Sequence, residues 1–287
     1  MKISEILQKG KPTLSYELFP PKPGMKLGNT KKIVREIAEL SPAFMSVTCG
    51  ASGSGSKNTL SVAKEIQVVN NVTALAHLVC ISLSREEIHQ MLDDLKAQGI
   101  NNIMALRGDL PPGETDHTGH FRYASELIEE IHRHGDFSVG GGCYPEGHPE
   151  SENLQKDIDS LKIKADAGCQ FLATQMFFDN NILYNFMFRL LKRGVDVPVV
   201  AGVMPVVNAA QINRICQLSG TALPPRFRAI VDRFADNPAA MHQAGIAFAT
   251  EQIIDLVANG VHHIHVYAMN KPEIARSIAA NVSEIFT

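Results

Sequence analysis

The chain has 287 residues, of which 45% are hydrophobic and 20% are charged, and its formal net charge is -3. This composition is typical of globular proteins, and the absence of long Lys/Arg runs gives no sign of a nucleic-acid-binding surface. No apolar stretch approaches the roughly 20 residues that cross a bilayer, and the charges spread over residues 1–19 predict no signal peptide.

Eight short apolar runs predict strands, and they lie at residues 13–19, 43–49, 72–79, 100–107, 136–143, 170–177, 197–203 and 262–267. Between them, stretches such as 29–40, 85–99 and 123–135 repeat apolar residues at intervals of three and four, which indicates helices. Strands that alternate with helices favour a parallel sheet with right-handed crossovers.

The predicted fold class is α/β, with residues 1–287 forming a single (β/α)8 TIM barrel. Eight strands in fewer than 300 residues fit such a barrel. Residues 208–260 hold several helical patterns, which we interpret as extra helices before the last strand and not as a second domain. An open doubly wound sheet is the alternative, but no GxGxxG unit links a predicted strand to a helix.

The cysteines give no sign of a disulfide framework or a zinc ribbon. The chain has five, at positions 49, 80, 143, 169 and 216. An odd number without a CxxC pair argues against both. Reduced thiols in a cytoplasmic protein are therefore expected.

Polar residues gather where the predicted strands end, which is the face that carries function in such barrels. In chain order they are Glu17, Thr48, His77, Arg107, Gly108, Asp109, Tyr144, Glu146, His148, Gln175, Tyr267 and Asn270. Taken singly, Glu17 could be a paired buried charge, His77 a hydrogen-bonded core histidine, and the sequence RGD a solvated turn. Polar groups inside apolar runs are costly unless they are paired or used, so several on successive strands favour one shared site.

This set of residues excludes several kinds of chemistry. No His, Cys or carboxylate cluster has metal-ligand spacing, so no metal site is predicted. No GxSxG elbow and no Walker loop occur. One carboxylate within a strand, an Arg–Asp pair, amides and hydroxyls suit a planar polar ring that receives one proton, with a cofactor carrying the harder chemistry.

Six segments then occur in a familiar order: YELFPPK (16–22), SVTCGASGS (46–54), ALRGDLPPG (105–113), CYPEGHPE (143–150), LATQMFFD (172–179) and GVMPV (202–206). Together they closely resemble the methylenetetrahydrofolate reductases, from about residue 13 to the end of the chain. The length is similar to the short bacterial form of that family.

The resemblance implies an FAD-dependent oxidoreductase that reduces 5,10-methylenetetrahydrofolate to 5-methyltetrahydrofolate. It implies a ping-pong reaction in which NADH or NADPH first reduces the flavin and folate then takes its place. It also implies a homo-oligomer. Neither the choice of nicotinamide nucleotide nor the subunit interface can be read from the sequence.

The resemblance also implies roles for individual residues. Glu17 matches the family's general acid, and Asp109 matches an aspartate near the flavin and pterin rings, so these two are the expected catalytic residues. The flavin contacts it implies are Thr48, His77, Arg107, Gly108, Asp109, Tyr144, His148, Asp157 and Lys164, with Tyr123 and Ala124 near the adenosine end. The folate contacts it implies are Glu17, Asp109, Gln175, Gln211 and Lys271.

Two local patterns bear on these assignments. Asp157 and Lys164 recur at helical spacing, so they either face one ligand or form a solvent-exposed pair. The prolines of LPPG (110–113) are expected to restrict the loop that presents Asp109.

Two positions depart from the family pattern. The family often has an aromatic residue four positions after the one matched by Gln211, where this chain has Ile215 and therefore lacks the stacking ring. Lys271 stands where an arginine is common, and it keeps the charge but loses the bidentate fork for a folate carboxylate.

Other functions remain open at this point. A folate-binding barrel that passes a methyl group to a cobalamin partner would bind no flavin and would give Glu17 no role. A relative that needs a partner protein as electron donor would not turn over NADH directly. A flavin barrel that oxidises proline is not favoured by RGDLPPG and YPEGHPE.

Overall fold

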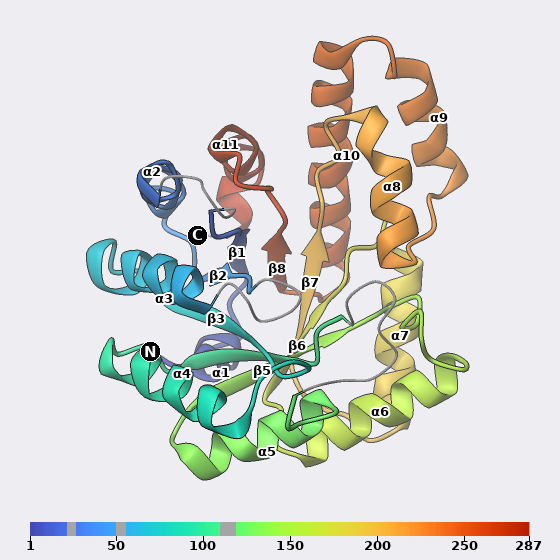
Figure 1. Cartoon of the computed structure of the whole chain (residues 1–287). Helices are drawn as coiled ribbons and strands as arrows, with labels where there is room; N and C mark the ends of the chain where they lie inside the picture. The colour runs from blue at the N-terminus through green and yellow to red at the C-terminus, as the bar shows by residue number, and fades with distance from the viewer. Residues whose placement is uncertain (22–26, 50–55, 110–118, 287) are drawn as a thin grey trace.

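The computed structural model describes residues 1–21, 27–49, 56–109 and 119–286 (Figure 1). Eight parallel strands form a closed barrel in chain order, and the last strand pairs with the first. The strands are β1 (Thr13–Leu18), β2 (Met45–Val47), β3 (Ala74–Val79), β4 (Asn102–Leu106), β5 (Ser138–Cys143), β6 (Phe171–Thr174), β7 (Val199–Val203) and β8 (His263–Val266). The predicted (β/α)8 barrel is therefore confirmed, with each strand shorter than or equal to its apolar run.

Helices surround the barrel. They are α1 (Ile3–Leu7), α2 (Leu27–Ala38), α3 (Ser56–Lys64), α4 (Arg85–Ala97), α5 (Ala124–His134), α6 (Leu154–Asp166), α7 (Asn180–Lys192), α8 (Ala209–Ser219), α9 (Pro225–Phe234), α10 (Pro238–Ala258) and α11 (Pro272–Asn281). A π-helical turn, η1 (Glu65–Val69), extends α3, and a 3-10 turn, η2 (Ser283–Ile285), follows α11. Figure 1 shows α8, α9 and α10 standing together above β7, so the extra helices expected before the last strand are confirmed.

Local sequence explains where the helices begin. At α4, Ser84 accepts a hydrogen bond from the backbone of Glu87 at 3.1 Å, and the Glu87 carboxylate accepts one from the Ser84 backbone at 2.8 Å. This capping box satisfies two backbone donors that the helix leaves open. At α6, the Asn153 side chain accepts from the Lys156 backbone at 3.0 Å in the same way.

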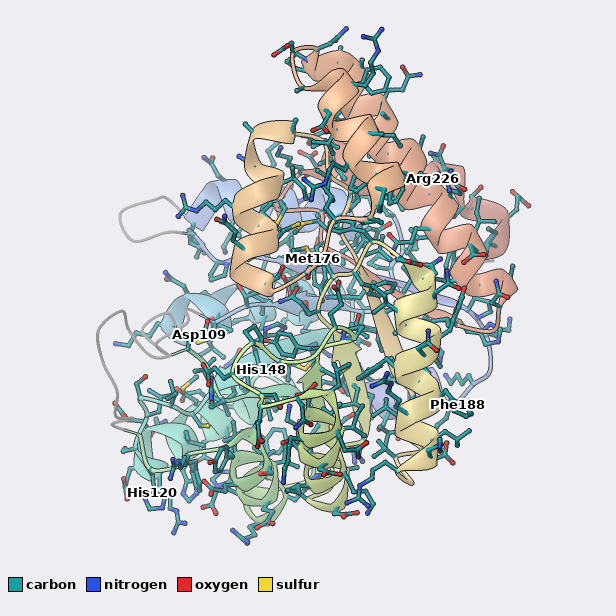
Figure 2. All side chains as sticks on the ribbon, turned by 90° about the vertical axis from the view of Figure 1, so that its right-hand side faces the viewer. Asp109, His120, His148, Met176, Phe188 and Arg226 are labelled. Carbon is teal, nitrogen blue, oxygen red and sulfur yellow. The ribbon has the colours of Figure 1, made fainter. Side chains whose placement is uncertain are left out.

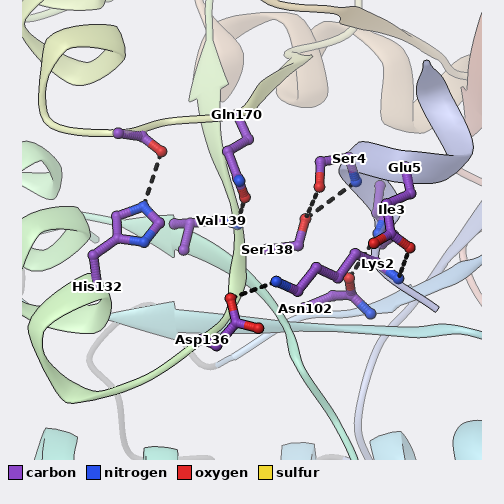
Figure 3. Close-up of polar contacts among 11 residues, drawn as sticks. Lys2, Ile3, Ser4, Glu5, Asn102, His132, Asp136, Ser138, Val139 and Gln170 are labelled. Carbon is purple, nitrogen blue, oxygen red and sulfur yellow. Dashed lines mark hydrogen bonds and ion pairs between the residues drawn. The ribbon is translucent and has the colours of Figure 1, made fainter.

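The short helix α1, which the sequence patterns did not predict, closes the lower end of the barrel. Its Ile3 and Leu7 pack inside the lumen with Phe44, Leu75 and Phe171. The backbone of Ile3 donates to the Asn102 amide at 2.8 Å, and the backbone of Ser4 donates to the Ser138 hydroxyl at 3.1 Å (Figure 3). The lower lumen is thus apolar and sealed, which leaves the upper end as the open face.

Glycines in two strands make room for lumen side chains. A Cβ at Gly140 of β5 would lie 2.3 Å from the ring of Phe171, its neighbour in register on β6. A Cβ at Gly202 of β7 would lie 2.6 Å from the Tyr267 hydroxyl and 2.4 Å from the Thr174 carbonyl. Both contacts are far below van der Waals separation, so a larger residue would displace the lumen.

The described part of the chain has neither a membrane-spanning helix nor a cluster of metal ligands. No helix there is long and apolar enough to cross a membrane. No group of three His, Cys, Asp or Glu side chains there could hold a metal ion.

Candidate active site

Glu17 lies near the upper end of β1 and points across the lumen towards β3. Its Oε2 is 3.8 Å from Nε2 of His77, and only 12% of the Glu17 side chain and 10% of the His77 side chain are exposed. Burial raises the pKa of Glu17 to about 8 and lowers the pKa of His77 to about 4. Both groups are therefore neutral at pH 7, and the pair is a protonated acid beside an uncharged imidazole.

Below this pair the lumen becomes a hydrogen-bonded layer centred on His265 of β8. Ser15 lies 2.8 Å from Nδ1 of His265 and Ser46 lies 2.9 Å from its Nε2. The hydroxyl of Tyr267 donates to the Thr174 carbonyl at 2.6 Å. His265 and Ser46 are not among the predicted site residues, although the alternation in HHIHVY places His263, His265 and Tyr267 on one face of a strand.

Asn270 fixes the backbone that follows Glu17. Its side chain accepts a hydrogen bond from the backbone of Phe19 at 2.8 Å and donates to the Phe19 carbonyl at 2.8 Å. Asn270 itself has φ +57°, a conformation that asparagine tolerates better than most residues. The loop after β8 therefore holds the loop after β1 in place.

A second cluster lies where β4, β5 and α6 meet. Arg107 forms two hydrogen bonds with the Glu150 carboxylate, at 2.6 and 2.7 Å, and these bonds raise the pKa of the guanidinium. The charge of Asp109, which is exposed, also raises the pKa of Arg107. Tyr144 and His148 stack edge to face with their ring centroids 4.6 Å apart.

Asp157 and Lys164 belong to this cluster and are not a solvent-exposed pair. The Asp157 side chain is buried, and burial raises its pKa, whereas the charges of Lys164 and His148 favour the carboxylate. Lys164 donates to the Gly142 carbonyl at 2.8 Å, and burial lowers its pKa. The solvent-exposed pair, one of the two alternatives for this helix, is therefore wrong, and the alternative in which both groups face one ligand stays a prediction.

The structure brings these two clusters together at the open end of the barrel. Burial raises the pKa of Tyr267, and Glu17 of the first cluster and Tyr144 of the second raise it further. Figure 2 shows Asp109 and His148 towards the same face of the molecule. Both clusters follow the carboxyl ends of strands, and the shared site that the sequence predicts there stays a prediction.

The remaining predicted residues surround these clusters or lie on neighbouring elements. Thr48 follows β2 and is half-buried; Gln175 follows β6, and its side chain accepts from the Met176 backbone at 2.9 Å. Gly108, between Arg107 and Asp109, has φ +91°, a conformation that favours glycine. Tyr123 and Ala124 begin α5, Gln211 lies exposed on α8, and Lys271 lies exposed just before α11. The LPPG prediction concerns residues 110–113, which lie outside the described residues.

The region around α8 has its own apolar cluster, in which Met176 and Ile212 pack with Phe227 and the half-buried Ile215 joins them. Glu146, in the loop after β5, accepts a hydrogen bond from the backbone of Ala222 at 2.9 Å. This contact ties the segment after α8 to the strand ends.

The donor set fits a cofactor with an anionic linker and a polar ring. Arg107 and Lys164 supply two cations, and arginine pairs well with phosphate oxygens. The buried Glu17 and His77 lie above a hydrogen-bonded layer of Ser15, Ser46 and His265, all of which are buried. An acid that stays protonated at pH 7 can deliver one proton to a bound molecule.

A family model described as methylenetetrahydrofolate reductase matches residues 2–283. The chain is 32% identical to 5,10-methylenetetrahydrofolate reductase of Escherichia coli (strain K12), with 94% of this chain and 90% of that protein covered.

The chain is also 32% identical to methylenetetrahydrofolate reductase (NADH) 1 of Arabidopsis thaliana, with 99% of this chain covered. It spans only 50% of the length of that plant relative. A solved structure, an uncharacterized protein from Clostridium thermocellum that binds two copies of 5-methyl-5,6,7,8-tetrahydrofolic acid, superposes with a TM-score of 0.65. The superposition covers 100% of this chain and 99% of the Clostridium thermocellum chain. At 13% sequence identity it supports the fold alone.

Proposed function

The chain belongs to the methylenetetrahydrofolate reductase family, and we propose that it uses FAD and a reduced nicotinamide nucleotide to convert 5,10-methylenetetrahydrofolate to 5-methyltetrahydrofolate. The observation that carries this proposal is the Glu17 carboxyl, which burial keeps protonated at neutral pH at the open end of the barrel. The reaction needs one proton and one hydride, and a protonated acid in a water-poor site can supply the proton.

Glu17 would act on the folate as a general acid. It donates its proton to the bridging nitrogen, the five-membered ring opens, and the one-carbon unit becomes an iminium that can accept hydride. FAD, held by the second cluster, would supply that hydride. His77 stays neutral because burial lowers its pKa to about 4, so it does not compete as a proton donor.

The second cluster would hold the cofactor. Arg107, His148 and Lys164 supply donors for the FAD linker, and Asp157 and Tyr144 supply polar contacts beside them. Thr48, His77 and Gly108 complete the contacts proposed for the flavin ring, and Tyr123 and Ala124 those for the adenosine end. A cation pair beside a diphosphate gains from charge-assisted hydrogen bonds.

Asp109 would bind the amino edge of the pterin and disfavour negative charge on the reduced flavin. Gln175 would hold the pterin from the end of β6, whereas Gln211 and Lys271 would contact the folate from α8 and from the segment before α11. These assignments rest on the resemblance and on the placement of the residues around one open face.

The test is anaerobic spectroscopy of the full chain reconstituted with FAD. Bleaching of the flavin by NADH or NADPH, followed by recovery when 5,10-methylenetetrahydrofolate is added, would establish both half-reactions and the nucleotide used. Glu17→Gln should retain bleaching and slow recovery by about 10²- to 10⁴-fold, the usual contribution of a general acid. Glu130→Gln, a buried carboxylate between α4 and α5, is the control and should leave both steps unchanged.

Two outcomes would overturn the proposal. A protein that does not bind FAD would favour the methyltransferase alternative. A flavoprotein that neither nucleotide reduces would require a partner electron donor. The proposed homo-oligomer is checked separately, by light scattering of the purified protein.

A further inference from the structure

The hydrogen bonds in the layer beneath Glu17 determine which ring nitrogen of His265 carries the hydrogen. Ser15 donates its hydroxyl hydrogen to the Ile264 carbonyl at 2.9 Å, since a carbonyl can only accept. A serine has one such hydrogen, so towards Nδ1 of His265, 2.8 Å away, Ser15 can only accept. His265 therefore carries its ring hydrogen on Nδ1.

The tautomer of His265 then fixes the direction of the next hydrogen bond. His265 is buried, and burial lowers its pKa to about 3, so the ring is neutral and its Nε2 has a lone pair. Ser46, 2.9 Å from that atom, must donate to it. The only hydrogen of the Ser46 hydroxyl is thereby directed at His265.

Ser46 lies in the path of the Glu17 side chain. It is the residue of β2 in register with Glu17 of β1. Glu17 reaches His77 on β3, and β2 lies between those two strands, so the glutamate crosses the lumen face of β2. The Ser46 hydroxyl donates its only hydrogen to His265, so towards Glu17 it can only accept a hydrogen bond.

The hydroxyl of Tyr267, the residue after β8, is also engaged elsewhere. It donates to the Thr174 carbonyl at 2.6 Å, so that hydrogen is also directed away. Burial raises the pKa of Tyr267 well above its usual value, and the nearby Glu17 raises it further. The titratable groups near Glu17 are thus His77 from β3, whose Nε2 is 3.8 Å away, and Tyr267 just after β8, with His265 below, and all of them are neutral at pH 7.

We propose that His265 is a positioning residue for Glu17: by accepting the Ser46 hydrogen, it keeps the hydroxyl that is in register with the acid from donating a hydrogen bond to it. A free Ser46 hydroxyl could donate to a carboxylate and favour ionisation, whereas one whose hydrogen is engaged can only accept from the protonated acid. The layer therefore adds a directional preference for the protonated acid to the effect of burial. The inference deepens the proposed function and rests on Glu17 being its proton donor.

The wild-type protein provides the first test. Imidazole ¹⁵N NMR of the full chain, labelled at histidine, should show His265 as the neutral Nδ1–H tautomer between pH 6 and 9, with His265→Phe used to assign its signal. A neutral Nε2–H tautomer would overturn the inference, because Ser46 would then be free to donate to Glu17.

Variants provide the second test, with the ¹³C carboxyl signal of Glu17 as readout and Glu17→Gln as its assignment. In His265→Phe the ring and its stacking on Phe44 are kept, but Ser46 loses its acceptor and can turn towards Glu17. The Glu17 titration midpoint should fall by about one to two pH units, the size of one hydrogen bond to an ionised group.

A double variant separates this mechanism from general damage to the lumen. Adding Ser46→Ala to His265→Phe removes the freed hydroxyl, so the Glu17 midpoint should return towards the wild-type value. An unchanged midpoint in the single variant, or no return in the double variant, would overturn the inference. The matched control is Thr13→Val, which breaks a hydroxyl–imidazole contact of 3.0 Å with His263 at the lower end of the same strand pair. It should leave the midpoint where it is.

These outcomes are distinguishable from failure of the proposed function. Both NMR readouts are independent of turnover, so the directional layer can be established in a protein that does not reduce folate. Conversely, two active half-reactions with an Nε2–H His265 would leave the proposed function in place and remove only the role of His265.

Discussion

Replacing Glu17 with Gln should stabilise the folded protein at neutral pH, although it removes the proposed proton donor. In the folded state burial raises the pKa of Glu17 from 4.5 to about 8. In the unfolded chain the carboxyl ionises with its ordinary pKa, so above pH 4.5 the unfolded state gains free energy by releasing a proton that the folded state retains. Glutamine has no proton to release and avoids this cost.

The magnitude follows from the size of the shift. Because the folded pKa lies above the unfolded one, the contribution of Glu17 to stability is full below pH 4.5 and is lost progressively as the pH rises to 8. The loss is about 1.4 kcal/mol per pH unit, which makes about 3 kcal/mol at pH 7. The midpoint of thermal unfolding of Glu17→Gln should then exceed that of the wild type by roughly 6 °C at pH 7, at about 2 °C per kcal/mol for a chain of this size.

The assay is urea unfolding of both proteins at several pH values from 5 to 8. The free energy of unfolding of Glu17→Gln relative to wild type should rise steadily over this range. Any constant difference from the amide's own hydrogen bonds shifts all points equally and leaves the slope unchanged. A difference that stays flat from pH 5 to 8 would refute the raised pKa and, with it, the reasoning about the proton donor.

Glu130→Gln is the control with the opposite sign. Burial acts to raise the pKa of Glu130, but hydrogen bonds from His89 and Arg133 outweigh it and lower the pKa. The contribution of Glu130 is therefore present above the unfolded pKa and lost only on acidification. Glu130→Gln should be less stable than wild type by an amount that does not change between pH 5 and 8.

Three further changes test other parts of the site. Arg107→Lys loses the planar guanidinium that now binds Glu150 through two hydrogen bonds. FAD titration should therefore show a dissociation constant about tenfold higher than that of the wild type. An unchanged constant would mean that Arg107 does not hold the cofactor. Ile215→Phe restores the ring common in the family, and steady-state kinetics should show a folate KM lower by several-fold with kcat little changed, as one aromatic contact of about 1 kcal/mol allows; a higher KM would place Ile215 away from the folate. Gly202→Ala places a Cβ 2.6 Å from the Tyr267 hydroxyl, and urea unfolding should show a loss of about 1–3 kcal/mol; full stability would mean that the lumen yields at that point.

The barrel could be predicted from sequence because each strand of a parallel barrel is buried on its outer face and largely on its inner one. The run VTALAHLV predicts β3 in this way, and all six residues of the observed strand are buried. The helix α1 could not be predicted, since a five-residue helix has too few turns to show a period. What makes it a helix is the lumen itself, which buries Ile3 and Leu7 and supplies partners for its first backbone donors.

Some residues of the candidate site can also be predicted from the sequence, and others cannot. Glu17 and His77 stand out because charged or ionisable residues interrupt apolar runs, and their meeting across β2 follows from barrel closure. Ser46 does not stand out, since a serine in a strand has no pattern of its own. Its part depends on register and on which atom of His265 carries a hydrogen, and both are settled by contacts between residues more than 200 positions apart.

The two halves of the barrel lumen therefore have opposite effects on the stability of the fold. Its lower half, filled by Phe44, Leu75 and Phe171, stabilises the fold through apolar burial. Its upper half gives up part of that stability by burying an acid whose ionised form would prefer water. The cost of about 3 kcal/mol at pH 7 and the readiness of Glu17 to donate a proton have one origin, the pKa raised by burial. A substitution of Glu17 that removes this cost must also weaken proton donation. Variants selected for stability alone should therefore accumulate at this position and lose folate reduction.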